Sequence, residues 1–168
     1  MIIRLSEKLC TKIKVGKLKE MPLDENLYAD WSANLFVVDR TQYIILSNTA
    51  SLYSCVMYGK EINNDSWFIQ RALNSIREFM DTDGCEDVYL NQIAPSTRTV
   101  CFAKALNRQV IGSMNELVMS ASIALECSEV SPFEVGFGIN NLRLTAITTQ
   151  DDHGYTPKIA FQRLASRE

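Results

Sequence analysis

Residues 31–58 read WSANLFVVDRTQYIILSNTASLYSCVMY, and this stretch decides the fold. It holds three runs rich in Val, Ile, Leu, Phe and Tyr, separated by breaks at residues 39–41 and 48–51. Apolar runs of this length between turn-forming residues are typical of β-strands. The stretch therefore predicts two successive hairpins of an antiparallel sheet.

Apolar side chains occupy both alternating sets of positions in these runs. In the second run, Tyr43 and Ile45 point one way while Ile44 and Leu46 point the other. A sheet with one face in water would carry a polar residue at every second position. We therefore expect both faces of the sheet to be covered, by other parts of the chain or by a second copy of it.

The cover is expected from two long amphipathic helices. Residues 66–80 and 107–126 place apolar side chains at helical spacing, and Asn107 is the predicted N-cap of the second helix. Gly112 lies inside this helix, where glycine costs about 1 kcal/mol relative to alanine, so we expect another backbone or a ligand to approach it closely. The predicted fold class is α+β, with the sheet built on the hairpins of residues 31–58.

Shorter elements complete the expected architecture. Ser6 is a plausible cap for a short helix ending near Gly16, and Ser131 with Glu134 forms a capping box for another. Three further strands are predicted: residues 2–5 at a sheet edge, 99–103, and 142–149. Residues 1–150 are thus predicted to form a single domain, and residues 151–168 a polar C-terminal tail with a loop at 151–154.

Composition limits the class of protein. The chain has 168 residues, 46% of them hydrophobic and 22% charged, with a formal net charge of −3. These values are typical of a globular domain and argue against a globally basic, phosphate-seeking protein. The N-terminus becomes charged early, and no run approaches the roughly 18 apolar residues of a membrane helix, so we expect a cytoplasmic protein without membrane attachment. The five widely spaced cysteines, with no C-x-x-C, are expected to be reduced thiols rather than disulfides or zinc ligands.

A basic run follows the N-terminal strand, with Lys8, Lys12, Lys14, Lys17 and Lys19. One interpretation is a patch for nucleic acid or for an acidic partner. The other, which we favour from the sequence, is a solvated helix face with cations near the C-terminal end of the helix dipole.

Polar residues beside the apolar elements are the candidate binding residues. Arg108 near a helix N-terminus suits an anion, because unpaired backbone N–H groups there favour negative charge. In the alternative structural interpretation, Asn107 caps the helix and the asparagines near the hairpins satisfy turn backbone. The candidates for a ligand or anion are Asn34, Arg40, Asn48, Asn107, Arg108, Asn115 and Glu116.

Two aromatic residues at strand ends, Trp31 and Tyr53, are candidates for stacking a nucleic-acid base. The alternative is that both rings belong to the core, which the acidic composition favours.

The sequence offers few residues or motifs suited to catalysis. His153 is the only histidine and lies in the predicted tail, which leaves little for Ser-His or Cys-His pairs or for histidine-bearing metal sites. Gly136-x-Gly138 lacks the third glycine of a dinucleotide loop, and Asp81–Asp87 lacks the ligand spacing of an EF-hand, so no cofactor or metal is expected. The sequence favours a non-catalytic binding module for a protein or nucleic-acid partner, with a homodimer as one way to cover leftover sheet surface. The alternative is a small histidine-independent hydrolase or nuclease that uses Arg108 and Glu116 in a polar cleft.

Several motifs carry a resemblance to a known family. They are WSANLF at 31–36, RTQYIIL at 40–46, NTASLY at 48–53, LNRQVIGSMNEL at 106–117 and SPFE at 131–134. The chain resembles, through about residue 147, a family of small bacterial proteins classed as a domain of unknown function. The resemblance implies a bacterial-type cytoplasmic protein and carries no activity, cofactor or catalytic residue.

Overall fold

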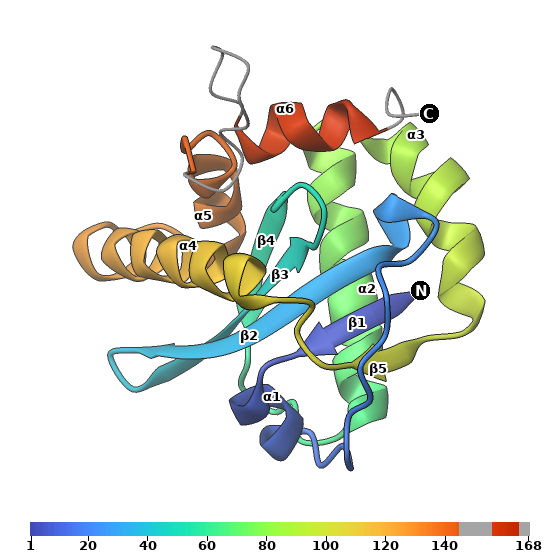
Figure 1. Cartoon of the computed structure of the whole chain (residues 1–168). Helices are drawn as coiled ribbons and strands as arrows, with labels where there is room; N and C mark the ends of the chain where they lie inside the picture. Colours follow the sequence, from blue (N-terminus) through green and yellow to red (C-terminus); the bar gives the residue numbers. More distant parts are fainter. Residues whose placement is uncertain (145–155, 165–168) are drawn as a thin grey trace.

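A computed structural model describes residues 1–144 and 156–164 of the chain (Figure 1). These residues form an α+β fold around a five-stranded sheet, as the sequence predicts. The strands are β1 (Ile2–Leu5), β2 (Asp30–Val38), β3 (Thr41–Asn48), β4 (Ser54–Tyr58) and β5 (Cys101–Ala103). The α-helices are α1 (Glu7–Lys12), α2 (Asp65–Thr82), α3 (Glu86–Val88), α4 (Arg108–Cys127), α5 (Pro132–Ile139) and α6 (Pro157–Gln162). Shorter helical turns are η1 (Leu27–Ala29), η2 (Tyr89–Ile93) and η3 (Ala94–Arg98).

The sheet has the order β4-β3-β2-β1-β5. Strands β2, β3 and β4 pair antiparallel, which confirms both predicted hairpins. Strand β1 pairs parallel with β2 on one side and with β5 on the other. The sheet is therefore mixed, and the prediction of a purely antiparallel sheet with residues 2–5 at its edge was wrong. A strand of four residues gives no sequence signal for its partners, because parallel neighbours are reached through long crossovers.

Both faces of the sheet are covered by helices of the same chain, as expected. Helix α2 lies behind the sheet and α4 crosses in front of it, next to α5 (Figure 1). On the α2 face, Ile44 and Leu46 of β3 pack with Phe68, Ile76 and Phe79. On the α4 face, the other set of side chains of β3, Tyr43 and Ile45, packs with Met114 and Leu117. The apolar runs of residues 31–58 thus serve two separate cores.

The helix starts follow local capping chemistry. Asn107 accepts a hydrogen bond from the backbone N–H of Val110 at 2.9 Å, as predicted for the start of α4. Ser131 and Glu134 form the predicted capping box of α5, which lowers the pKa of the Glu134 carboxyl through hydrogen bonds from the backbone and side chain of Ser131. Helix α2 begins at Asp65, one residue earlier than expected, because its N-cap is Asn64.

The C-terminal part holds an element that the sequence did not suggest. Within the segment expected as a polar tail, Pro157–Gln162 forms α6, and the ring of Phe161 is fully buried against Tyr53 at a centroid distance of 4.4 Å. Lys158 of the same helix pairs with Asp83 at 2.7 Å, and Asp83 also accepts a hydrogen bond from the Tyr53 hydroxyl. Residues 142–144 of the predicted last strand are not in a strand, while 145–149 and the predicted loop at 151–154 lie outside the described residues.

Candidate functional site

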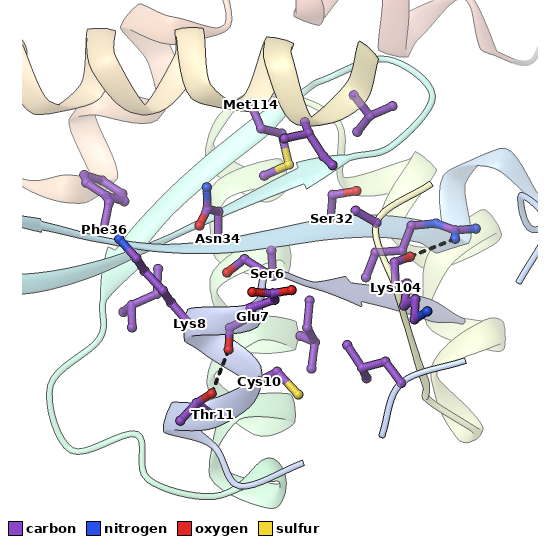
Figure 2. Close-up of a pocket in the computed structure, with 18 of the residues that line it drawn as sticks. Ser6, Glu7, Lys8, Cys10, Thr11, Ser32, Asn34, Phe36, Lys104 and Met114 are labelled. Atoms are coloured by element: carbon purple, nitrogen blue, oxygen red, sulfur yellow. Dashed lines mark hydrogen bonds between the residues drawn. The ribbon is translucent and has the colours of Figure 1, made fainter. Parts of the chain in front are cut away.

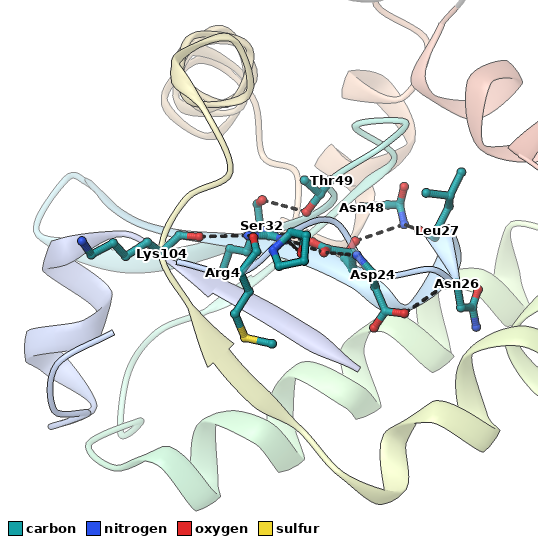
Figure 3. Close-up of polar contacts among 11 residues, drawn as sticks. Arg4, Asp24, Asn26, Leu27, Ser32, Asn48, Thr49 and Lys104 are labelled. Carbon is teal, nitrogen blue, oxygen red and sulfur yellow. Dashed lines mark hydrogen bonds and ion pairs between the residues drawn. The ribbon is translucent and has the colours of Figure 1, made fainter. Parts of the chain in front are cut away.

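A buried ion pair anchors one end of the α4 face of the sheet. The Arg4 guanidinium of β1 donates to both carboxylate oxygens of Asp30 of β2 at 2.8 Å. Its remaining N–H groups donate to the carbonyls of Met21 (3.0 Å), Lys104 (3.2 Å) and Pro22 (2.7 Å), so all five donors of Arg4 are used. Arg4 thereby ties two loops to the sheet (Figure 3). The pair is structural, because it leaves Arg4 no free donor for a ligand.

Beside this anchor lies a cleft of about 1030 Å³. Strand β2 contributes its residues 32–36, α1 and its flanking loop form one wall, and the first half of α4 forms the other (Figure 2). Most of the lining is apolar, from Leu5, Leu18, Ala33, Leu35, Phe36, Ala105, Val110, Ile111, Met114 and Val118. The sequence folds this way locally because α4 packs on β2 with its first turns while α1 leaves the sheet directly after β1.

Two carboxamides line this cleft. Asn34 is half-buried and points from β2 towards α4 (Figure 2), whereas Asn115 is exposed on the first half of α4. Neither side chain has a hydrogen-bond partner among the described residues. Nearby Ser32 is satisfied by the Thr49 hydroxyl at 2.9 Å. Asn34 and Asn115 are thus free to bind a group that enters the cleft.

The charged side chains of the cleft are mainly cationic. Lys8, Lys17 and Lys104 line it together with one free carboxylate, that of Glu7. Lys104 makes an exposed pair with Glu20 at 3.3 Å, whereas Lys8 and Lys17 have no partner among residues 1–144 and 156–164. Lys8 extends from α1 towards β2 beside Phe36 (Figure 2). Two lysines of the predicted basic run therefore belong to the cleft.

The structure brings together only some of the predicted site residues. Asn34 and Asn115 both line the cleft, although 80 residues separate them in the chain. Arg40 lies in the tight turn between β2 and β3 with φ of 66°, and Asn107 is occupied as the cap of α4. Arg108 and Glu116 are on exposed turns of α4 and do not line the cleft.

Asn48 has a structural role. Its amide donates to the carbonyls of Leu27 (2.8 Å) and Asp30 (3.2 Å), and its oxygen accepts from the backbone N–H of Ser51 at 3.0 Å. It thereby holds the turn between β3 and β4 against the start of β2 (Figure 3).

The predicted stacking residues are both in the core of the α2 face. Trp31 is 1% exposed and donates its indole N–H to the carbonyl of Tyr28. Tyr53 is fully buried, and burial, followed by its hydrogen bond to Asp83, raises its pKa far above the ordinary value. This burial excludes the base-stacking role predicted for the two rings. The close approach of another backbone, one of the two alternatives expected at Gly112, is absent among the described residues, because a Cβ at this position would meet nothing within 4 Å.

A metal site and a membrane-spanning helix are two further possibilities. No group of three or more His, Cys, Asp and Glu side chains in residues 1–144 and 156–164 is placed to hold a metal ion. Helix α4 is long and apolar enough to cross a membrane by length and composition, but it packs on β2 and α5. Its outer side leaves Met119 and Ile123 exposed.

The sequence matches the model of one protein family over residues 2–158, nearly its whole length. That family is described as a domain of unknown function (DUF6933). The chain belongs to this family. The match ends at residue 158, inside α6, so the DUF6933 domain extends about ten residues beyond the motif resemblance. No curated protein matches the sequence.

Proposed function

We propose that this DUF6933 protein is a non-catalytic binding module for a protein partner, and that the cleft between α1, β2 and α4 is its binding site. The observation that carries the proposal is the half-buried carboxamide of Asn34, which has no hydrogen-bond partner among the described residues and lies in a mostly apolar cleft that the exposed Asn115 also lines. A concave apolar surface with a few placed polar groups is the usual form of a binding site.

The size of the cleft supports a segment of chain as its occupant. Small-molecule pockets enclose roughly 300–1,000 Å³. At about 1030 Å³, this cleft is at the upper end of that range and is bounded by two helices and a strand rather than closed. Such a trough suits several residues of a partner protein better than a single compact ligand.

The alternative of a hydrolase or nuclease has less support. A catalytic site would gather acid, base and anion-holding side chains within hydrogen-bond reach of one point. Arg108 and Glu116, the residues expected to act in such a site, lie outside the cleft. The free polar groups that do line it are mainly amides and ammonium groups, with the single carboxylate of Glu7.

A nucleic-acid partner is also less well supported. Single-stranded nucleic acid is usually held by several exposed aromatic rings along a basic groove. Phe36 is the one aromatic residue among those that line the cleft, and Trp31 and Tyr53 are buried elsewhere.

Selection from a phage-displayed library of random dodecapeptides tests the proposal. We expect the wild-type protein to enrich peptides that fail to bind Asn34→Trp, in which an indole fills the cleft. Asn74→Trp, on an exposed position of α2, is the matched control and should retain them. Asn115→Trp provides a second block from the helix wall. Enrichment of peptides that bind all variants equally, or no enrichment, would refute the proposed site.

A further inference from the structure

We infer that the partner segment is acidic and extended, with its main chain paired by Asn34 and Asn115 and its carboxylates held by Lys8 and Lys17. This inference rests on the proposed function and names the partner class for the same cleft. Three observations carry it: the charge of the cleft, the chemistry of two amides that have no partner within residues 1–144 and 156–164, and the apolar side chains beside Asn34.

The cleft is a positive region on a negative protein. The whole chain has a formal net charge of −3, whereas the cleft is lined by three lysines and a single free carboxylate. The charge of Arg4 does not add to this field at full strength, because Asp30 lies against it at 2.8 Å. Complementary charge across an interface favours the right partner and speeds association. A segment rich in Asp and Glu is therefore attracted to the cleft.

Asn140 shows how an asparagine side chain can form two hydrogen bonds with an extended main chain. Asn140 donates its side-chain N–H to the carbonyl of Ser54 at 2.8 Å and accepts the Ser54 backbone N–H at 2.7 Å. A single side chain thereby satisfies the backbone N–H and C=O of Ser54 at the outer edge of β4. Asn34 has the same donor and acceptor and no hydrogen-bond partner in the described part of the chain, so an extended main chain can satisfy both.

Apolar contacts complete the match. In an extended segment, alternate side chains point to opposite sides, so main-chain hydrogen bonds give affinity while pockets accept every second side chain. Phe36 of β2 and Met114 of α4 lie on either side of Asn34 (Figure 2). We therefore expect apolar residues to alternate with acidic ones in the bound segment.

Charge reversal within the same peptide selection tests the inference. We expect the peptides blocked by Asn34→Trp to carry more Asp and Glu than Lys and Arg, relative to the unselected library. For one such peptide made synthetically, Lys8→Glu/Lys17→Glu should weaken binding at least about tenfold, and the loss should shrink at high salt. The control, Lys60→Glu/Arg77→Glu, changes the total charge equally at exposed positions on other parts of the surface and should bind as wild type.

A scan of backbone N-methylation in the same peptide tests the extended main chain. Loss of affinity at alternate positions is expected, and Asn34→Leu should abolish the effect at the position it pairs. Peptides that depend on the cleft but are neutral or basic would overturn the inference and leave the proposed function standing. Tighter cleft-dependent binding of fluorescein-labelled (dT)12 than of any selected peptide would overturn it in favour of nucleic acid. A failure to select any cleft-dependent peptide would refute both.

Discussion

Buried polar residues in this protein act mainly on main chain. Arg4 holds the carbonyls of Met21, Pro22 and Lys104, and Asn140 holds Ser54. These side chains hold loops and strand edges that have no partner within the sheet. The hydrogen bonds offset the cost of removing the polar side chains from water. Asn34 differs from them, since it is only half-buried, has no hydrogen-bond partner among the described residues and faces the cleft.

Replacing Arg4 by Met tests the importance of the ion pair. The change leaves the Asp30 carboxylate, which is 0% exposed, without its cation, and we expect a loss of about 3–5 kcal/mol in the free energy of unfolding. Urea denaturation of both proteins measures it. Lys60→Met, at an exposed position, should stay within about 0.5 kcal/mol of wild type. A loss below about 1 kcal/mol for Arg4→Met would contradict this account of the anchor.

Substitution of two glycines by alanine is expected to change the stability of the fold in opposite directions. A Cβ at Gly136 of α5 would lie 2.5 Å from the Phe79 ring, so Gly136→Ala should destabilise the fold by about 1–3 kcal/mol. Gly112 of α4 has open space around it, and Gly112→Ala should stabilise by about 0.5–1 kcal/mol through helix propensity. Thermal unfolding of the two variants shows directly whether each substitution lowers or raises the stability. Equal effects would show that α5 does not approach Phe79 as closely as described.

At the residue scale, local chemistry was predictable and distant pairing was not. Asn107 and Ser131 were identified as caps because a cap bonds to N–H groups two or three residues away. Arg4 pairs with Asp30 across 26 residues, and nothing in the neighbourhood of either residue reveals the other. The roles of Asn34 and Asn48, both beside predicted strands, also depended on which side chain found an internal partner.

At the scale of elements, period and turn residues located the two hairpins and both long helices. The parallel placement of β1 between β2 and β5 was missed, because a run of four residues carries no information about strand direction. Helix α6 was missed for a related reason. Its six residues are too few for a clear helical period, and the burial of Phe161 depends on Tyr28, Trp31 and Tyr53.

The contribution of α6 is measurable with one substitution. Phe161→Ala removes a ring that stacks on Tyr53 in the core, and we expect a loss of about 3–5 kcal/mol in the free energy of unfolding. Ile159→Ala, at a position 37% exposed on the same helix, should cost much less. Equilibrium denaturation compares them. Similar small losses for both variants would mean that α6 is not part of the core.

At the scale of the whole molecule, the two faces of the sheet have different roles. The α2 face holds the larger core, with Trp31, Tyr53, Phe79 and Phe161. The α4 face is apolar only over β2, β3 and β4, and towards β1 it gives way to the Arg4 anchor and the cleft. The sequence predicted that both faces of the sheet are covered, but it did not predict that the α4 face also holds a cleft. The position of the cleft depends on how α1 and α4 are placed relative to β2.

The central claim is that a partner binds in the cleft between α1, β2 and α4. A titration of ¹⁵N-labelled protein with a selected acidic dodecapeptide, followed by two-dimensional NMR, tests it most directly. We predict that the side-chain NH₂ resonances of Asn34 and Asn115 shift together, along with the backbone of β2 and the first half of α4, while that of Asn74 stays in place. Shifts confined to α2 or to the outer side of α4, with Asn34 and Asn115 unmoved, would contradict the account.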